Sequence, residues 1–240
     1  FSWSCRYLDP AAMRAFQLLG LHPGREVGVD AAAALLDTDA AQARARIDTL
    51  VRAHLVGEYT AGRFGMHDLL RAYAAERAAS RPEADRRAAL ARLSDHYLRT
   101  ATAAMWIAFP TGVARPPAQP FASSDDARSW LDAERSNLLA VADGGYASQF
   151  SAVLAGYLEV RAHYADALTL HDLAYQAART RGDRVGEAAA RNRLGGIRRL
   201  MGHYGQASAH YERALALAQE LGDQAVAATA RYGLGTLCWR

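Results

Sequence analysis

A histidine and an aspartate, His67-Asp68, lie where a short apolar run ends and a helical pattern begins. Phe64–Met66 has the character of a strand, and the residues after Asp68 have a helical period. A helix that begins at this seam presents unpaired backbone N–H groups and its positive dipole end, and a histidine adds a side-chain donor beside them. Asp68 can hold the helix start or orient the imidazole. The pair is therefore suited to an anionic group, and the alternative is that His67 closes the hairpin and packs.

The elements that must position this pair fill the first eighty residues. Asp9-Pro10 predicts a helix start, because aspartate caps a first turn and proline fits the first helical position. Thr60-Ala61-Gly62 reads as a hairpin loop between two strand-like runs. The expected elements are a helix ending before Gly20, helices at Val29–Leu36 and Ala40–Leu55, strands at Val56–Tyr59 and Arg63–Met66, and a closing helix. Three helices, a two-stranded wing and a closing helix predict a winged-helix domain over residues 1–80.

Residues 81–145 are expected to be linker helices. One helix spans about Arg86 to Trp106, and the proline-rich connection at 110–120 ends it because proline cannot donate to the helical ladder. Ser123-Ser124-Asp125-Asp126 predicts a capping-box start for the next helix, which Gly144-Gly145 closes.

Beyond residue 145 the sequence repeats itself every 40 residues. The recurring residues are Leu154, Leu194 and Leu234, His163-Tyr164 and His203-Tyr204, Ala167 and Ala207, Ala174 and Ala214, and Gly182-Asp183 and Gly222-Asp223. Each copy predicts a helical hairpin, in which Gly195 or Gly235 lets two helices approach closely. Gly182 and Gly222 can end a hairpin with a positive φ, and the following aspartates can cap the next one. Residues 146–240 are therefore predicted to form an α-solenoid, with the last repeat truncated.

One face of the first helix in each hairpin carries candidate partner-binding residues. In the second copy these are Asn192, Gly196 and Arg199, which lie opposite Leu194, Ile197 and Met201. The equivalents in the third copy are Tyr232, Thr236 and Trp239. The alternative is an ordinary solvated face, or a contact to a further repeat.

The repeat resembles the tetratricopeptide family through Leu194-Gly195, Gly202-His203-Tyr204, Ala207, Tyr211 and Ala214. With the first domain added, the chain resembles the C-terminal part of a STAND-class NB-ARC regulator, closest to the SARP-type actinobacterial transcriptional activators. Met66-His67-Asp68 matches the "MHD" signature of NB-ARC winged helices. The resemblance implies that His67 contacts the β-phosphate of ADP in the full-length protein, with Asp68 beside it. It also implies an upstream NB-ARC domain as partner and a protein or peptide effector at the repeats.

Composition excludes several classes of site. All 28 basic residues are arginine, so neither a lysine-dependent P-loop nor a Schiff-base lysine exists in this chain. The eight histidines show no metal-ligand spacing, and no nucleophile elbow appears. The predicted third helix carries Arg44, Arg46 and Arg52 without Asn, Ser or Thr at reading positions, and the net charge is only +3. The sequence predicts no catalysis, no metal, no cofactor of its own and no DNA contact through this segment.

The preferred interpretation is a regulatory and sensing segment, in which the winged helix stabilises the ADP-bound off state and the repeats receive an effector. The alternative is a DNA-binding winged helix fused to a tetratricopeptide adaptor. No apolar run is long enough to span a membrane, and two distant cysteines fit a reducing cytosol, so a cytoplasmic protein is expected. Phe1 and Arg240 suggest a piece of a longer chain, which we expect to self-associate through the exposed end of the solenoid.

Overall fold

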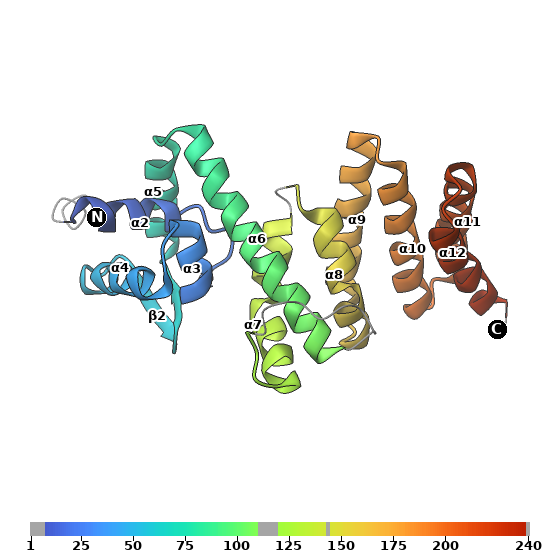
Figure 1. Cartoon of the computed structure of the whole chain (residues 1–240), viewed down its shortest axis with the longest axis horizontal. Coiled ribbons are helices and arrows are strands. Elements are labelled where there is room, and N and C mark those ends of the chain that lie inside the picture. The colour runs from blue at the N-terminus through green and yellow to red at the C-terminus, as the bar shows by residue number, and fades with distance from the viewer. Residues whose placement is uncertain (1–7, 110–119, 143–144, 239–240) are drawn as a thin grey trace. The chain divides into compact units, whose positions relative to one another are not determined.

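The computed structural model describes residues 8–109, 120–142 and 145–238, which divide into two compact units (Figure 1). The first unit contains the described residues up to Thr100 together with Ser136–Val141. The second contains Ala101–Arg135 and the residues from Ala142 onward. Two long helices, α6 (Glu83–Ala108) and α7 (Ser124–Ala142), therefore contribute to both units. The residues predicted as linker, 81–145, are shared between the two.

The first unit has the expected winged-helix-like order of helices and strands. Its elements are α2 (Pro10–Leu19), β1 (Glu26–Gly28), α3 (Val29–Leu36), α4 (Ala40–Arg52), β2 (Gly57–Thr60), β3 (Arg63–Gly65) and α5 (Asp68–Ala79). Local capping explains the helix starts: the Asp9 carboxylate accepts hydrogen bonds from the N–H groups of Ala11 and Ala12 at 2.8 Å, and Asp39 caps α4 in the same way. The predicted N-cap at Asp9 is confirmed.

The sheet of this unit has three strands rather than the predicted two. Its order is β1-β3-β2, and β3 pairs antiparallel with both neighbours. The third strand, β1, was missed because it is three residues long with one buried side chain, Val27, and its partner lies 37 residues further along the chain. The hairpin loop is as predicted, and Gly62 adopts a φ of 75° that favours glycine.

The core of the first unit lies between its helices and the inner face of the sheet. Its largest fully buried side chains are Tyr97, Phe16, Phe64, Leu18, Leu35, Leu36, Ile47, Leu50, Leu55 and Leu93. Burying a leucine- or phenylalanine-sized side chain stabilises the folded state by about 1.5–3 kcal/mol, so these residues together hold the helices on the small sheet. This packing fixes where β3 ends and α5 begins.

The second unit contains a stack of helical hairpins. Its later helices are α8 (Ala147–Val160), α9 (Tyr164–Arg181), α10 (Arg184–Leu200), α11 (Tyr204–Leu221) and α12 (Gln224–Leu237). Figure 1 shows α8 to α11 side by side in chain order, and α10 contacts both α8 and α12. Gly182 and Gly222 end α9 and α11 with φ of 68° and 71°, and the Asp183 and Asp223 carboxylates cap the next helices. The predicted α-solenoid and its 40-residue period are confirmed.

Helix α7 continues the same 40-residue register toward the N-terminus. Ala127, Ala167 and Ala207 are spaced by 40 and are all fully buried, on α7, α9 and α11 respectively. The final turns of α6 lie beside the first repeat, since Met105 Cε is 3.6 Å from where a Cβ of Gly156 would stand. Residues 101–108 and α7 thus take the places of the first and second helices of a preceding hairpin. The sequence pattern did not indicate this hairpin.

One aromatic ring holds two hairpins together. Tyr211 of α11 packs on Gly195 of α10 and Gly233 of α12, where an added Cβ would lie 2.9 and 2.4 Å from the ring. The predicted close approach at Gly195 is confirmed, because only hydrogen fits there. The same expectation for Gly235 is wrong, since a Cβ at Gly235 would meet nothing within 4 Å.

The equivalent position one repeat earlier holds a histidine. His171 is fully buried on α9, its Nδ1 lies 2.8 Å from Ser151 Oγ, and its Nε2 has no partner among the described residues. Burial, with a smaller effect of the nearby Arg193 charge, lowers the pKa of His171 to about 3. Arg193 stands 40 residues before Gly233. In the earlier repeat an arginine therefore takes the place of that glycine, beside the imidazole that takes the place of the Tyr211 ring. The imidazole of His171 is therefore neutral in the folded protein at neutral pH.

Two glycine substitutions on α12 should act in opposite directions. Gly233→Ala forces a methyl group against the Tyr211 ring and should destabilise the chain by ~1–3 kcal/mol. Gly235→Ala enters open space and should stabilise it by up to ~1 kcal/mol, because alanine favours the helix. Thermal and urea unfolding of both variants measures the difference. Equal effects of the two substitutions would contradict the placement of Tyr211.

Acid should destabilise the solenoid through His171. A histidine whose folded pKa is about 3 stabilises the fold fully only above its unfolded pKa, and that stability falls as pH drops toward 3. With an unfolded pKa of about 6.5, the loss between pH 7 and 5 is about 2 kcal/mol. His171→Leu should remove this part of the pH dependence, and His203→Leu at an exposed position should keep it. Urea unfolding at pH 7 and pH 5 measures this dependence. If His171→Leu lost as much stability between the two pH values as the unmodified chain, the assignment to His171 would be wrong.

Candidate functional site at the strand-to-helix seam and on the repeats

The predicted seam lies where the sequence placed it. Strand β3 ends at Gly65, the side chain of Met66 is buried, and α5 begins at Asp68 with His67 as its N-cap residue. The carbonyl of His67 accepts the first helical bond, from the Arg71 N–H at 2.9 Å. Its imidazole is exposed and makes no side-chain cap bond. His67 therefore does not pack into the core, and its ring is accessible beside the first turn.

An exposed apolar side chain adjoins the histidine and the aspartate. Leu69 is 62% exposed on the first turn of α5, whereas Leu70, the next residue, is buried. Asp68 is also exposed. The start of α5 thus presents an imidazole, a carboxylate and a leucine in three successive residues.

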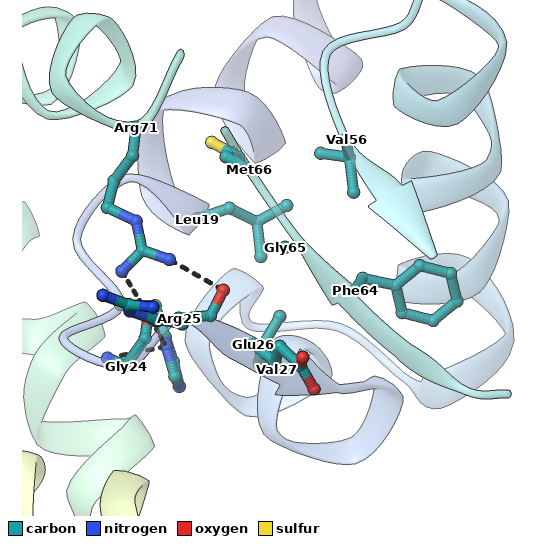
Figure 2. A pocket seen from close by; sticks show the side chains of 11 residues that line it. Leu19, Gly24, Arg25, Glu26, Val27, Val56, Phe64, Gly65, Met66 and Arg71 are labelled. Atoms are coloured by element: carbon teal, nitrogen blue, oxygen red, sulfur yellow. Dashed lines mark hydrogen bonds between the residues drawn. The ribbon is translucent and has the colours of Figure 1, made fainter. Parts of the chain in front are cut away.

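Behind the seam, Arg71 ties α5 to the loop that precedes β1. Its Nη1 and Nη2 donate to the carbonyls of Gly24 and Arg25 at 2.5 and 2.7 Å. Figure 2 shows the guanidinium of Arg71 reaching these carbonyls at the edge of a pocket. The pocket is lined by Leu19, His22, Gly24–Val27, Val56, Phe64–Met66 and Arg71. No local sequence pattern indicated the role of Arg71, because its acceptors are backbone groups more than 40 residues away.

Two of the three arginines of α4, Arg44 and Arg52, are engaged within their own domain. Arg44 Nε lies 2.8 Å from the Asp48 carboxylate, its Nη2 lies 3.8 Å from Glu58, and its guanidinium sits 4.9 Å from the Phe64 ring centre. Arg52 donates to the hydroxyl of Thr49 at 2.9 Å. These two side chains are thus held by neighbours rather than extended toward a groove.

On the repeats, the first helices present a polar cluster. Glu159 of α8 is half-buried, and burial raises the pKa of its carboxyl while the opposing Arg199 charge lowers it. Burial also raises the pKa of the Tyr211 hydroxyl, while Arg199 of α10 lowers that pKa. Gly196 lies beside two of these side chains, since an added Cβ would be 3.4 Å from Glu159 Oε1 and 3.8 Å from the Tyr211 hydroxyl. We call Glu159, Gly196, Arg199 and Tyr211 the inner-face cluster.

The predicted partner-binding residues occupy different environments. Asn192 is 7% exposed and donates from Nδ2 to the Val226 carbonyl of α12 at 3.0 Å, so it joins two repeats. Arg199 belongs to the inner-face cluster. Tyr232 is 75% exposed, and Thr236 donates to the Gly233 carbonyl of its own helix. Trp239 lies outside the described residues.

Glu159 is the residue that the sequence interpretation missed on this face. It stands 40 residues before Arg199, so the same offset that revealed the repeats could have found it. Tyr211 was expected only as a residue of the repeat pattern, but it also belongs to the inner-face cluster. On α12, Leu234 and Leu237 are only partly buried, as expected for a helix whose outer side has no further hairpin against it among the described residues.

Within the described ranges, no group of three or more histidine, cysteine, aspartate or glutamate side chains could hold a metal ion. None of the helices in that part of the chain is both long and apolar enough to cross a membrane.

The solenoid matches a known family. Residues 152–220 match the model of the tetratricopeptide repeat family, and this range runs from α8 to the end of α11. These residues are tetratricopeptide repeats. Repeats of this kind bury a continuous core by stacking hairpins, which is the arrangement seen from α8 to α12.

Two curated relatives extend the likeness beyond the repeats. The chain is 39% identical over 145 residues to the regulatory protein AfsR of Streptomyces griseus, and 38% identical over 146 residues to that of Streptomyces coelicolor. These matches cover 56% and 55% of this chain and 15% of each relative. The matched part is thus a small fraction of the relatives' length, and the likeness is to regulatory proteins that contain much more chain.

A solved structure also aligns with the chain at low similarity. It is a STAND signal-transduction ATPase with a tetratricopeptide repeat sensor from Pyrococcus horikoshii, with 15% identity and a TM-score of 0.36. The alignment covers 98% of this chain and 48% of that one. A TM-score this low carries no argument about fold or function.

Proposed function

We propose that this chain is the regulatory and sensing segment of a STAND-type NB-ARC transcriptional regulator. In this proposal the winged-helix-like domain stabilises the ADP-bound off state, and the tetratricopeptide repeats bind a protein or peptide effector that changes the balance of states. The segment has no catalysis and no cofactor of its own; ADP and ATP bind the nucleotide domain of the full-length protein. The two regulatory relatives support a regulatory role.

The observation that carries this proposal is the exposed imidazole of His67 at the N-terminus of α5. A helix N-terminus attracts an anion through its free N–H groups and dipole, and His67 adds a donor at the same place. Leu69 gives the surface an apolar part that a docked domain can cover. An ADP phosphate would accept hydrogen bonds at the start of α5, and the nucleotide domain that holds the ADP would cover Leu69.

For the repeats we propose the inner-face cluster as the effector site. Arg199 and Glu159 supply one cation and one anion close to each other, beside Gly196. Tyr232 extends this surface onto α12 as an exposed aromatic. Aromatic and arginine side chains dominate the energetics of protein interfaces, so Arg199 and Tyr232 are the residues whose truncation should weaken effector binding most.

The alternative, a DNA-binding winged helix fused to an adaptor, has less support. Sequence-specific readout in the major groove needs side chains that reach base edges. Arg44 is paired with Asp48 and Glu58 and stacked near Phe64, and Arg52 is bonded to Thr49. The described Arg and Asp/Glu side chains of the first unit also nearly balance in number.

In the full-length protein, His67→Ala should release ADP faster. A hydrogen bond from the imidazole to a phosphate is worth about 1.5–3 kcal/mol, which corresponds to a tenfold to hundredfold change in the ratio of states. Asp68→Ala should have a smaller effect in the same direction if it only orients the turn. Dissociation of a fluorescent ADP analogue from the full-length protein measures both effects. Arg77→Ala, exposed on the same helix, is the matched control. Equal off-rates for His67→Ala and the unmodified protein, with the fold intact, would sink the proposed role.

The 240-residue chain alone should not bind ATP or ADP at micromolar concentration. It contains no lysine for a P-loop, and one histidine at a helix start contributes too little to hold a free nucleotide. Isothermal titration calorimetry on the purified chain tests this. Saturable micromolar binding would contradict a site shared with another domain and would point to a complete nucleotide site within the chain.

A further inference from the structure

The loop between α2 and β1 is held without free space on three sides. An added Cβ at Gly20 would lie 2.6 Å from the Ala74 backbone of α5, and one at Gly65 would lie 2.5 Å from the Arg25 carbonyl. At Gly24 it would lie 1.8 Å from Asn137 Oδ1 on α7. None of the three glycines has a positive φ, so glycine is required here by space rather than by backbone conformation. The loop therefore cannot shift independently of α5, β3 and the 136–141 part of α7.

Hydrogen bonds connect the same elements. On one side Arg71 of α5 donates to the carbonyls of Gly24 and Arg25. On the other side Asn137 donates from Nδ2 to the Glu26 carbonyl at 2.9 Å and to the Tyr97 hydroxyl of α6 at 3.3 Å. Asn137 and Tyr97 are almost fully buried. Breaking these bonds would leave buried polar groups unsatisfied, so the docked arrangement is strongly preferred.

His22 completes this buried group from within the loop. Its Nδ1 lies 3.1 Å from the Gly24 nitrogen, which donates to it, and its Nε2 lies 3.3 Å from the Tyr97 hydroxyl. The loop thus contacts α6 through the His22 side chain, α7 through the Glu26 carbonyl, and α5 through the carbonyls of Gly24 and Arg25. We call residues His22–Glu26 the coupling loop.

Helix α7 carries contacts to the repeats on the turns before Asn137. The Tyr157 hydroxyl of α8 donates to the Asp132 carboxylate at 2.7 Å, and Arg161 Nη2 lies 3.0 Å from the same carboxylate. Arg135 lies against the His163 ring at the start of α9 and 3.4 Å from the Asp166 carboxylate. One helix therefore bears Asp132 and Arg135, which contact the first repeat, and Asn137, which contacts the coupling loop.

We propose that the coupling loop links the repeats to the seam at His67-Asp68, with Asn137 as the residue that senses displacement of α7. A shift of α7 either breaks the bonds of Asn137 or moves the coupling loop with it. Because Arg71 is held by the same loop and lies one turn after Asp68, movement of the loop displaces the start of α5. This inference deepens the proposed function and rests on it for its biological meaning. The linkage between α7 and α5 is a property of this chain that can be measured without nucleotide.

Amide hydrogen exchange on the 240-residue chain tests the linkage. Asn137→Ala should speed exchange about fivefold or more at residues 136–141 and also in the first turns of α5, since each lost buried hydrogen bond raises the open population by about that factor. Gly24→Ala should do the same, because its methyl group drives Asn137 out. Arg77→Gln on the exposed face of α5 is the control and should leave both segments unchanged.

The double variant Gly24→Ala with Asn137→Ala separates linkage from general damage. The double variant lacks the Asn137 amide with which the new methyl group at residue 24 would collide. Its amide exchange rate at the start of α5 should therefore equal that of Asn137→Ala alone, rather than show the combined increase of the two single variants. Faster exchange at 136–141 with an unchanged start of α5, in Asn137→Ala and Gly24→Ala alike, would overturn the proposal. Additive effects in the double variant would overturn it too.

ADP release from the full-length protein then distinguishes the two proposals. Asn137→Ala should speed release as His67→Ala does, while effector added to the Asn137→Ala protein should change the off-rate less than it does in the unmodified protein. If His67→Ala alone speeds release, the seam role stands and the coupling loop is wrong. If exchange at α5 responds to Asn137→Ala but neither variant alters release, the linkage stands and the proposed function fails.

Discussion

The stack of repeats depends on one packing constraint. A large aromatic ring on the second helix of a hairpin fits only where the first helix of its own hairpin and the first helix of the next hairpin both carry glycine at the contact. Tyr211 meets this condition at Gly195 and Gly233. One repeat earlier the ring is smaller, because His171 takes the place of the tyrosine and Arg193 the place of a glycine. The two junctions fill similar space with different chemistry. The earlier junction contains a buried imidazole and a partly buried cation, so it is the more polar and the more sensitive to acid of the two.

The sequence predicted those features that local chemistry determines. Helix starts at Asp9, Asp183 and Asp223 follow from carboxylates that cap free N–H groups, and helix ends at Gly182 and Gly222 follow from the left-handed conformation that glycine accepts. The position of His67 at the seam belongs to the same class, since the strand period and the helix period meet there. None of these features requires knowledge of distant residues.

What the sequence did not predict depends on contacts between distant segments. Strand β1 is too short to show a period and exists because β3 pairs with it. Arg71 and Asn137 bond to backbone carbonyls, which carry no residue-type signal. The hairpin formed by the end of α6 and by α7 was hidden because only the second helix keeps the 40-residue register. Asn192 was expected on an accessible face, but the next repeat covers it, and the helical period alone does not reveal how closely repeats stack.

Helix α7 is shared by the two compact units, and this affects how such proteins can be recombined. Residues 136–141 belong with the winged-helix-like unit, whereas 124–135 belong with the repeats. A junction placed within residues 124–142 would sever one continuous helix, and one between residues 135 and 137 would also separate Asn137 from Asp132 and Arg135. A sensor exchanged between two regulators would therefore have to bring α7 and the matching loop before β1 together. Repeats that follow α9 face no such restriction, so insertions and losses of whole hairpins are expected to accumulate there, away from the shared helix.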